Sequence, residues 1–334
     1  MSEVLLLNQR EIRECVTLDT DSIDVVENAF ASLARGKVVM PPILRLDISE
    51  HNGEVDVKTA YLPDLENFAI KVSPGFFNNP GLGLPSLNGM MMLLSGRTGL
   101  LQALLLDNGY LTAVRTAAAG AVAARWLARQ DSEEVALLGA GEQAELQLKA
   151  LLLVRDIKRV RVWARSAAKA QQLALQLSSV YGLEATAAES VDEAMSSADI
   201  AVTCTPSNQP ILHRRHLRPG LHITAMGADT EHKNEVAPEV IAAVDHYVAD
   251  RVSQTATLGE LHHAINAGVA QDPRVYAELG QVILGDRVGR LTPTDVTLCD
   301  LTGTGVQDCG FHAIRPPSPL SSGQAFQGHL ATCS

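Results

Sequence analysis

The chain has 334 residues, which exceeds the usual size of a single hydrophobic core and favours two domains. Hydrophobic residues make up 46% and charged residues 19%, an ordinary mixture for a soluble globular protein. The net charge of −11, the scattered basic residues and the 4% of aromatic residues argue against a nucleic-acid partner.

Neither a membrane segment nor a metal site is expected. No apolar run is long enough to span a membrane, and the first residues lack the parts of a signal peptide, so we expect a cytoplasmic protein. The near-pairs His213/His216 and His262/His263 lack a second pair of ligands. Five cysteines, an odd number without metal-like spacing, are expected to be reduced thiols: Cys15, Cys204, Cys299, Cys309 and Cys333.

The first 109 residues predict a mostly antiparallel sheet with one or two helices. Residues 21–36 are expected to be helical, because Ile23, Val26, Phe30 and Leu33 recur at helical spacing. Strand-like runs follow, separated by turn signals rich in Asn, Gly and Pro. They cover residues 43–48, 55–62, 68–75, 90–95 and 100–106.

The pattern changes at Thr112, which we expect to cap an alanine-rich helix over residues 112–128. Strands then alternate with helices, which predicts βαβ units and a parallel sheet. The predicted strands are 135–138, 159–164, 184–187, 200–204, 222–225, 246–249 and 296–300. The predicted helices are 142–154, 167–181, 191–196 and 238–243. The tail after about residue 315 is rich in Pro, Ser and Gly and is expected to be disordered.

A glycine turn links the first of these strands to its helix. The segment Gly-Ala-Gly-Glu-Gln-Ala fits the pattern G-x-G-x-x-A in the strand–turn–helix context of a dinucleotide site. Its first glycine permits the tight turn, and its second lets the backbone approach a pyrophosphate held by the helix start. The alternative is a turn that binds nothing. The predicted cofactor residues are Gly139, Ala140, Gly141, Glu142, Gln143 and Ala144.

The end of the second strand indicates which dinucleotide binds. NAD-binding proteins usually have an acid there, which accepts a hydrogen bond from the ribose 2′-hydroxyl. Here the strand ends on Arg165 and Ser166, without a carboxylate. A guanidinium suits a 2′-phosphate, and Ser166 could be a second donor, although an exposed arginine can also lack a ligand. We therefore predict a preference for NADP(H) over NAD(H).

Several blocks together resemble the ornithine cyclodeaminase/mu-crystallin family: residues 68–75, 107–124, 139–144, 225–235 and 299–308. The resemblance extends from the N-terminus to about Asp308. Residues 40–63 and 71–89 also resemble the subgroup that accompanies ectoine-utilisation proteins in bacteria.

The resemblance implies an α/β fold with two domains. A Rossmann dinucleotide-binding domain over residues 116–305 lies between the two parts of an α+β substrate-binding and dimerisation domain, residues 1–115 and 306–334. Members form homodimers, bind NAD(H) or NADP(H), and act on amino acids or imines. Mu-crystallin-like members with an arginine after the second strand favour NADPH, in agreement with Arg165.

The resemblance also implies a substrate site. Arg45, Lys71 and Arg115 match positions that hold the substrate's α-carboxylate, and Lys71 belongs to the catalytic set as well. Arginine binds a carboxylate in two places at once, and lysine adds a point charge. On the residues alone, Lys71 could also point outward from its strand. Arg115 lies in the first turn of its helix, where a cation needs a nearby anion.

Asp229 matches the family's catalytic carboxylate. It follows a predicted parallel strand at its carboxyl end, where α/β folds place their chemistry, and could manage the proton of the substrate nitrogen. The alternative is an ordinary turn cap. Lys233 is expected to support the same loop. The remaining predicted cofactor contacts are Thr116, Thr203, Thr205, Met226, Gly227, Thr302 and Gly303.

One position departs from the ornithine cyclodeaminases, in which a glutamate shortly before the proline of the substrate strand recognises the distal amine. Residues 58–63 contain no acid, and the nearest acids, Glu54 and Asp56, are displaced along the strand. Losing that counter-ion removes charge-assisted bonding worth on the order of a few kcal/mol.

The leading hypothesis is therefore an NADP(H)-preferring oxidoreductase of the C–N bond of an α-amino or α-imino acid. It would be an imine reductase or an amino-acid dehydrogenase, with ectoine catabolism as its suggested setting. The first alternative is a cyclodeaminase that releases ammonia from an ornithine-like or diaminobutyrate substrate. The second is an NADP-dependent ligand-binding protein of mu-crystallin type.

Overall fold

The computed structural model describes residues 4–63 and 65–310, so the predicted disordered tail lies outside the described residues. The chain divides into two compact units. The first unit comprises Met1–Thr17, Arg35–Arg115 and Gly305–Ser334, and the second comprises Leu18–Ala34 and Thr116–Thr304. The expected domain boundaries differ from this division at helix α2 (Thr20–Ala34), which packs against α10 (Leu279–Leu284) in the second unit.

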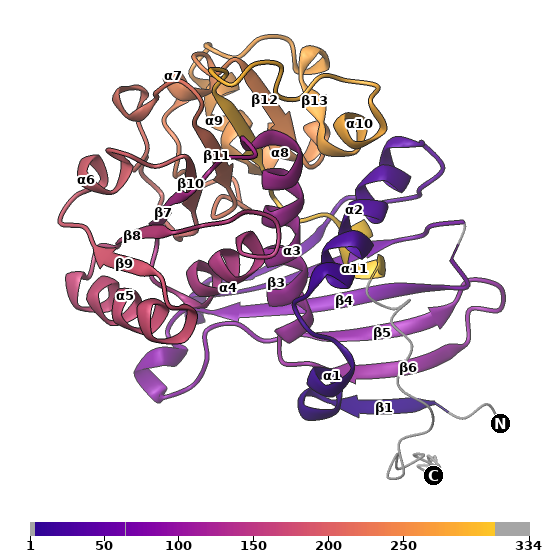
Figure 1. The fold of residues 1–334 in the computed structure, drawn as a ribbon. Coiled ribbons are helices and arrows are strands. Elements are labelled where there is room, and N and C mark those ends of the chain that lie inside the picture. The colour runs from indigo at the N-terminus through magenta and orange to yellow at the C-terminus, as the bar shows by residue number, and fades with distance from the viewer. Residues whose placement is uncertain (1–3, 64, 311–334) are drawn as a thin grey trace, which may run out of the picture. The chain divides into compact units, whose positions relative to one another are not determined.

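The first unit is built on a six-stranded sheet with the order β1-β6-β5-β4-β3-β2 (Figure 1). Its strands are β1 (Leu5–Asn8), β2 (Leu44–Ile48), β3 (Gly53–Ala60), β4 (Asn67–Phe76), β5 (Met90–Ser95) and β6 (Leu101–Leu106). The pairing is antiparallel except between β1 and β6, as the sequence predicts for most of this sheet. Strand β1 and the short helices α1 (Gln9–Cys15) and α11 (Gly305–Gly310) were not predicted.

The two faces of this sheet differ in composition, because cross-strand partners share a face and successive residues alternate. One face buries the polar side chains of Asp56, Lys58 and Lys71. The other, here called the apolar sheet face, is exposed or only half-buried. It is formed by Leu44, Leu46, Val55, Val57, Ile70, Val72, Met90 and Met92.

The second unit is built on an eight-stranded sheet whose pairs are all parallel, with the order β13-β12-β14-β11-β10-β7-β8-β9. The chain starts in the interior of the sheet at β7, builds β8 and β9 outward, and then returns to place β10 on the other side of β7. A ligand crevice forms outside the carboxyl ends of the strands at such a reversal of strand order. The strands are β7 (Glu134–Leu138), β8 (Arg159–Trp163), β9 (Glu184–Ala187), β10 (Ile200–Thr203), β11 (His222–Ala225), β12 (His246–Ala249), β13 (Ala277–Glu278) and β14 (Thr297–Asp300).

Helices cover both faces of the second sheet and enclose two hydrophobic cores. Residues of α4 (Glu142–Leu151) and α5 (Ala167–Tyr181) build one core with α3 (Tyr110–Leu127). The other core includes α6 (Val191–Met195), α7 (Pro238–Ile241) and α9 (Glu260–Asn266). Two further helices, α8 (Val252–Leu258) and α10, complete the unit, and with α9 they were not predicted. Among the described residues, none of the helices combines the length and the apolar character needed to cross a bilayer.

Helix α3 begins earlier than the sequence predicts. The side chain of Asp107 accepts a hydrogen bond from the backbone N–H of Leu111 at 2.8 Å, so the helix starts at Tyr110 and Thr112 lies inside it. The prediction of Thr112 as the cap was wrong, because a carboxylate further back satisfies the first amides. The helix continues across the division between the two units, which falls after Arg115.

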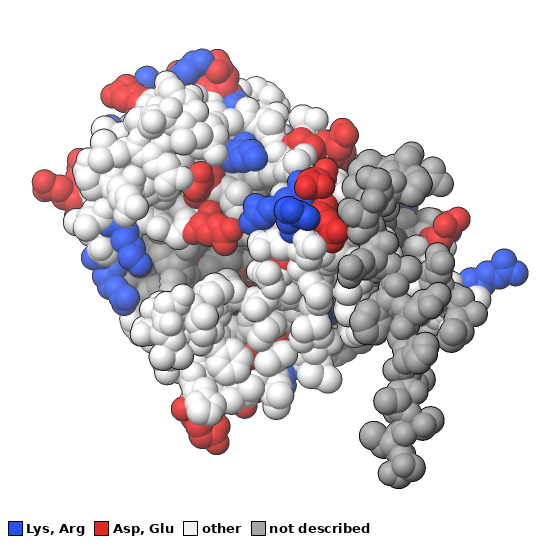
Figure 2. Space-filling view, turned by 90° about the horizontal axis from the view of Figure 1, so that it is seen from below, with Lys and Arg blue, Asp and Glu red and all other residues white. Residues whose placement is uncertain are grey.

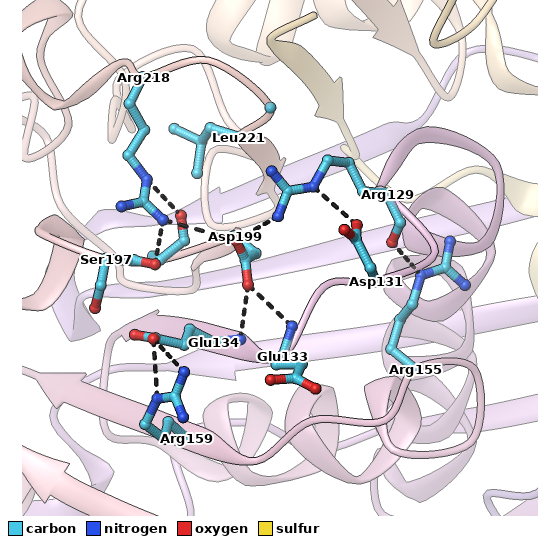
Figure 3. Close-up of polar contacts among 12 residues, drawn as sticks. Arg129, Asp131, Glu133, Glu134, Arg155, Arg159, Ser197, Asp199, Arg218 and Leu221 are labelled. Carbon is cyan, nitrogen blue, oxygen red and sulfur yellow. Dashed lines mark hydrogen bonds and ion pairs between the residues drawn. The ribbon is translucent and has the colours of Figure 1, made fainter. Parts of the chain in front are cut away.

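Asp199 joins the amino ends of the central strands of the second sheet (Figure 3). Its carboxylate accepts hydrogen bonds from the backbone N–H groups of Glu133 and Glu134 at 2.9 and 3.0 Å, and from Arg129 Nη2 at 2.8 Å. Arg218 approaches the same carboxylate at 3.7 Å. These contacts tie the end of α3 to the starts of β7 and β10, at the edge opposite the glycine turn.

The surface shows no concentration of positive charge on the face drawn in Figure 2. Lysines and arginines there form small groups, some of them beside aspartates and glutamates, and large areas carry neither. A nucleic-acid-binding face would instead carry a broad basic stripe.

Candidate functional site

The glycine turn lies where the sequence places it, between β7 and α4. Gly139 has φ +138°, and a Cβ there would lie 2.7 Å from the Cys204 sulfur, so no side chain fits. A Cβ at Gly141 would meet no described atom within 4 Å, so the backbone faces open space at the start of α4. Ala144 is fully buried in the core beneath the sheet. A tight turn, an open helix start and a close helix–sheet contact together fit a dinucleotide pyrophosphate.

Arg165 and Ser166 follow β8 at the same edge of the sheet. Arg165 is exposed, and it forms no ion pair with any residue that the structure describes. Ser166 is the N-cap of α5, and its hydroxyl accepts from the Lys169 amide at 3.5 Å. Thr116, on α3, accepts a hydrogen bond at its carbonyl from the side chain of Gln147.

The ends of β10 and β11 carry the next predicted cofactor residues. Thr203 is fully buried and its hydroxyl donates to Glu235 at 2.7 Å, so this side chain faces the protein interior. The Thr205 hydroxyl and the Gly227 amide also donate to Glu235. Met226 donates from its backbone to the carbonyl of Thr203 and packs against the core.

Asp229 lies in the loop after β11 and is paired with Lys233. Its Oδ1 atom is 2.5 Å from Lys233 Nζ, and the Asp229 side chain is 39% exposed while that of Lys233 is 12% exposed. The carbonyl of Lys233 is 2.7 Å from His263 Nε2 on α9. Asp229 therefore stays accessible while a half-buried lysine orients it.

The loop after β14 is held by Asp250. The Gly303 amide donates to Asp250 at 2.7 Å, and the hydroxyl of buried Thr302 donates to the same carboxylate at 3.0 Å. Gly303 has φ +80°, a conformation that favours glycine.

Buried charges gather on the polar face of the first sheet. Lys71 Nζ lies 2.9 Å from Asp308 Oδ2, and Arg115 Nε lies 3.3 Å from Asp308 Oδ1. Arg115 also donates to Gln307 at 3.2 Å. Lys58 is the cross-strand partner of Lys71 and is buried as well. Lys71 and Arg115 thus share the carboxylate of Asp308, and paired cations of this kind suit an anionic substrate group.

The pKa of Lys71 is well below that of an ordinary lysine. Burial, followed by the positive charge of Arg115, lowers the pKa of Lys71 to about 7, although Asp308 acts in the opposite direction. A lysine with a pKa near neutrality can exchange its proton under physiological conditions, which acid–base chemistry requires.

Arg45 is not in contact with this cluster. It forms ion pairs with Asp47 at 2.9 Å, with Glu54 at 2.5 Å and with Asp56 at 3.6 Å. Its strand β2 is two strands away from β4, which carries Lys71, a separation of about 10 Å at the usual strand spacing. The structure thus brings Lys71 and Arg115 together and leaves Arg45 engaged by three neighbouring acids.

The sequence profile of the ornithine cyclodeaminase/mu-crystallin family matches residues 2–314. The chain belongs to this family. A Rhizobium meliloti protein, provisionally named a dehydrogenase, is 57% identical over 94% of this chain and 95% of its own length. An uncharacterized cyclodeaminase of Sinorhizobium fredii is 53% identical over 98% of this chain and 100% of its own length.

Solved structures of similar fold include two oxidoreductases. The Thermococcus litoralis Δ1-pyrroline-2-carboxylate reductase, in complex with NADH and L-proline, matches with a TM-score of 0.88 and 30% identity, over 93% of this chain and 96% of its own. An archaeal alanine dehydrogenase dimer with bound NAD matches with a TM-score of 0.87 and 32% identity, over 94% and 95%. These likenesses confirm the predicted fold class of a Rossmann domain with a second domain.

In this member of the cyclodeaminase/mu-crystallin family, three residues that were not predicted from the sequence contact the predicted site residues. Asp308 and Gln307 lie on α11, whose six residues give too little periodicity to indicate a helix. Glu235 follows the Asp229 loop and contacts residues about 30 positions away in the chain. The blocks 225–235 and 299–308 that carry the family resemblance contain all three, and this was the available signal.

Proposed function

We propose that this protein is an NADP(H)-preferring oxidoreductase that acts on the C–N bond of an α-imino or α-amino acid. The observation that carries the proposal is the buried pair Lys71 and Arg115 around Asp308, in a chain that also has an open dinucleotide-type turn. The named activities of the relatives support it, because pyrroline-2-carboxylate is a cyclic imine with an α-carboxylate and alanine is an α-amino acid.

Each part of the proposed site has a physical role. The backbone of Gly139 and Gly141 and the start of α4 would hold the cofactor's pyrophosphate. Lys71 and Arg115 would bind the substrate carboxylate, with Lys71 protonated while the anion is bound. Asp229 would give a proton to the substrate nitrogen during reduction and take it back during oxidation. A bound nicotinamide supplies or accepts the hydride at the substrate's α-carbon.

The preference for NADP(H) is the finer part of the proposal. The solved relatives carry NADH and NAD. Arg165 supports NADP(H) in this chain, because it is exposed after β8 and has no ion-pair partner among the described residues. A guanidinium in that place can bind a 2′-phosphate through two parallel hydrogen bonds.

The chain is proposed to act as a cytoplasmic homodimer. The apolar sheet face supports dimerisation, since an exposed apolar patch of this kind usually marks an interface. The proposed domains follow the two compact units, with substrate binding and dimerisation in the first and dinucleotide binding in the second. A diaminobutyrate- or aspartate-related substrate would agree with the subgroup resemblance to ectoine-utilisation proteins.

A cyclodeaminase is the second candidate, because the Sinorhizobium fredii relative bears that name. The site favours it less. The acids nearest to the expected distal-amine position, Glu54 and Asp56, are both paired with Arg45. Neither is therefore available as the counter-ion of a substrate ammonium without breaking that pair.

Absorbance of the reduced nicotinamide tests the proposal. The protein is mixed with NADPH or NADH and a panel of cyclic imino acids, or keto acids plus ammonia, while ammonia release from ornithine and diaminobutyrate is measured in parallel. Net NADPH consumption with an imine is the expected result. Ammonia release without net cofactor change would establish the cyclodeaminase, and no change in either assay would contradict both enzyme assignments.

A further inference from the structure

Glu235 is a fully buried carboxylate that joins the carboxyl ends of β10 and β11. Its Oε1 atom accepts from the Thr205 amide at 2.5 Å and from the Thr205 hydroxyl at 2.7 Å. Its Oε2 atom accepts from the Thr203 hydroxyl at 2.7 Å and from the Gly227 amide at 2.8 Å. The strands β10 and β11 are neighbours in the sheet, and this one side chain fixes the loops that leave both of them.

This arrangement favours an ionised carboxylate. Two acceptor oxygens with two donors each fill the acceptor sites of a carboxylate. A proton on either oxygen would turn one acceptor site into a donor, so a threonine hydroxyl would have to reverse its direction or one of the four donors would lose its partner. Either change weakens the contacts that fix the two loops.

The backbone here leaves no room for a different contact. A Cβ at Gly227 would lie within van der Waals overlap of both Glu235 and the carbonyl of Thr205, so only glycine fits against the carboxylate. Gly227 is two residues before Asp229, and Thr205 follows the strand next to the reversal of strand order. The carboxylate thus fixes the segments that border the expected cofactor crevice and carry the proposed acid.

We propose that Glu235 is a positioning residue whose ionised side chain holds the loops after β10 and β11 in the conformation that binds the dinucleotide. The inference rests on the proposed function, since it assumes that these loops border a nicotinamide dinucleotide. Glu235 itself does not touch the cofactor in this assignment and acts through Thr205 and Gly227.

The surroundings of Glu235 place its titration in an accessible range. Glu260 on α9 accepts from the Glu235 amide at 2.9 Å, and Asp300 on β14 lies beyond it with its charge acting on Glu260. Cys204 at the end of β10 is the other titratable neighbour, and burial raises the pKa of its thiol. Burial raises the pKa of Glu235 to about 6, although its four hydrogen bonds lower it. Dinucleotide affinity should therefore fall as the pH falls through about 6.

The test is the affinity of the full chain for NAD⁺ by calorimetry between pH 5 and 8. NAD⁺ is the probe because it lacks the 2′-phosphate, whose own titration near pH 6 would confuse the result. The unaltered protein should lose up to about tenfold in affinity from pH 7.5 to pH 5. Glu235→Gln should bind weakly at pH 7.5 with little pH dependence, whereas the exposed control Glu239→Gln should behave as the unaltered protein does.

A second variant keeps the inference testable if Glu235→Gln does not fold. Thr203→Val removes one donor to the carboxylate and keeps its shape, so the midpoint of the affinity–pH curve should move to higher pH. A purely structural role for Thr203 would lower affinity equally at every pH.

Flat affinity of the unaltered protein across this range, or normal binding by Glu235→Gln, would overturn the inference while leaving the proposed function intact. An unaltered protein that binds neither NAD⁺ nor NADP⁺ at pH 7.5 would contradict the proposed function, and the inference with it.

Discussion

At the scale of single residues, the chemistry of the first unit depends on how one carboxylate is shared. Asp308 is 1% exposed and lies within ion-pair distance of both Lys71 and Arg115. A substrate carboxylate that binds these cations joins an anion that is already there. Asp308 therefore sets both the geometry of the cations and the readiness of Lys71 to stay charged.

Replacing Asp308 with asparagine should shift the alkaline limb of the pH–activity profile to lower pH. The negative charge of Asp308 raises the pKa of Lys71, so its loss should lower that pKa further below 7. Lys71 is protonated below its pKa. The decline of kcat/KM on the alkaline side should therefore begin at a lower pH in Asp308→Asn than in the unaltered enzyme. Breaking a buried pair should also cost about 3–5 kcal/mol of stability, measured by denaturant unfolding. Asp47→Asn, an exposed acid paired with Arg45, is the control, and an unmoved limb would contradict the role of Asp308.

Asp229 should be needed for turnover and not for cofactor binding. Its carboxylate is 39% exposed after β11, so replacing it with alanine removes the proposed acid without opening a cavity. Asp229→Ala should lose on the order of 100- to 10,000-fold in kcat, the range typical of general acid–base groups. Calorimetry should show unchanged NADP⁺ affinity. Glu231→Gln, an exposed neighbour, should keep full activity, and near-normal kcat in Asp229→Ala would show that the acid is elsewhere.

Arg165 should select the cofactor. Its replacement by alanine should weaken NADP⁺ binding by roughly 10- to 100-fold, because hydrogen bonds to a charged group are worth about 1.5–3 kcal/mol. NAD⁺ affinity should change little, since NAD⁺ has no 2′-phosphate. Arg214→Ala removes a comparable exposed arginine and should change neither affinity. Parallel titrations of both nucleotides decide the matter, and an equal loss for both would rule out recognition of the phosphate.

At the scale of elements, the turn between β7 and α4 contains two glycines with different physical reasons. Gly139 has a positive φ and the Cys204 sulfur in the place of a side chain, so the fold itself requires glycine there. Gly141 has φ −97° and open space where a Cβ would project. Any residue could adopt that conformation, so the fold itself does not require glycine there, whereas the proposed pyrophosphate contact would.

The two glycines should therefore respond differently to alanine. Gly141→Ala should fold with a melting temperature near that of the unaltered protein and yet bind NADP⁺ at least about tenfold more weakly, because a methyl group would meet the pyrophosphate. Gly139→Ala should lose both stability and binding. Thermal melting and calorimetry on the pair separate the two effects. Normal NADP⁺ affinity in Gly141→Ala would mean that the turn holds no phosphate.

The elements also show what the sequence could and could not predict. Long elements with a clear period were found at nearly their true bounds, and α5 matched residue for residue, as did the short strand β9. The unpredicted helices α1, α8, α9, α10 and α11 have six or seven residues each, fewer than two full turns. Strand β13 has two residues. Such short segments are fixed largely by tertiary contacts and leave little periodic signal, although the sequence did indicate the equally short α6 and α7.

The same limit explains the uneven prediction of the site. The glycine turn depends on local geometry, and the sequence located it completely. The grouping of Lys71 with Asp308 joins residues 237 positions apart, and no spacing rule reaches that far. Arg45 was expected beside Lys71, but its neighbours on β3, Glu54 and Asp56, are acids that bind it first. The resemblance indicated residue types and could not show which of them compete for one another.

At the scale of the whole molecule, the two faces of the first sheet differ in an unusual way. The first unit covers a face with buried charges and leaves the apolar sheet face partly exposed. Exposed apolar patches of this kind usually mark an interface. The proposed partner is a second copy of this chain; the archaeal alanine dehydrogenase of similar fold is itself a dimer.

A charge on this face should separate the proposed dimer. Val57 lies in its interior, with Leu44 and Val72 as cross-strand partners. Val57→Lys should be a monomer by light scattering at micromolar concentration, because burying an unpaired ammonium in an interface has a large desolvation cost. Its circular dichroism spectrum should be unchanged. The exposed control Glu50→Lys adds positive charge to the same unit and should leave the dimer intact. A dimer that survives in Val57→Lys would place the interface elsewhere.

The Asp199 network has a consequence for how such a family diversifies. It binds the amino ends of β7 and β10 together, while the glycine turn and the Glu235 contacts occupy the carboxyl ends of the same strands. Mutations that redirect substrate choice can accumulate at one edge of the sheet while the opposite edge keeps the strands in register. Engineered changes of specificity in this scaffold should accordingly leave Asp199 and Arg129 unaltered. The stability that their contacts provide then remains available to offset destabilising mutations elsewhere.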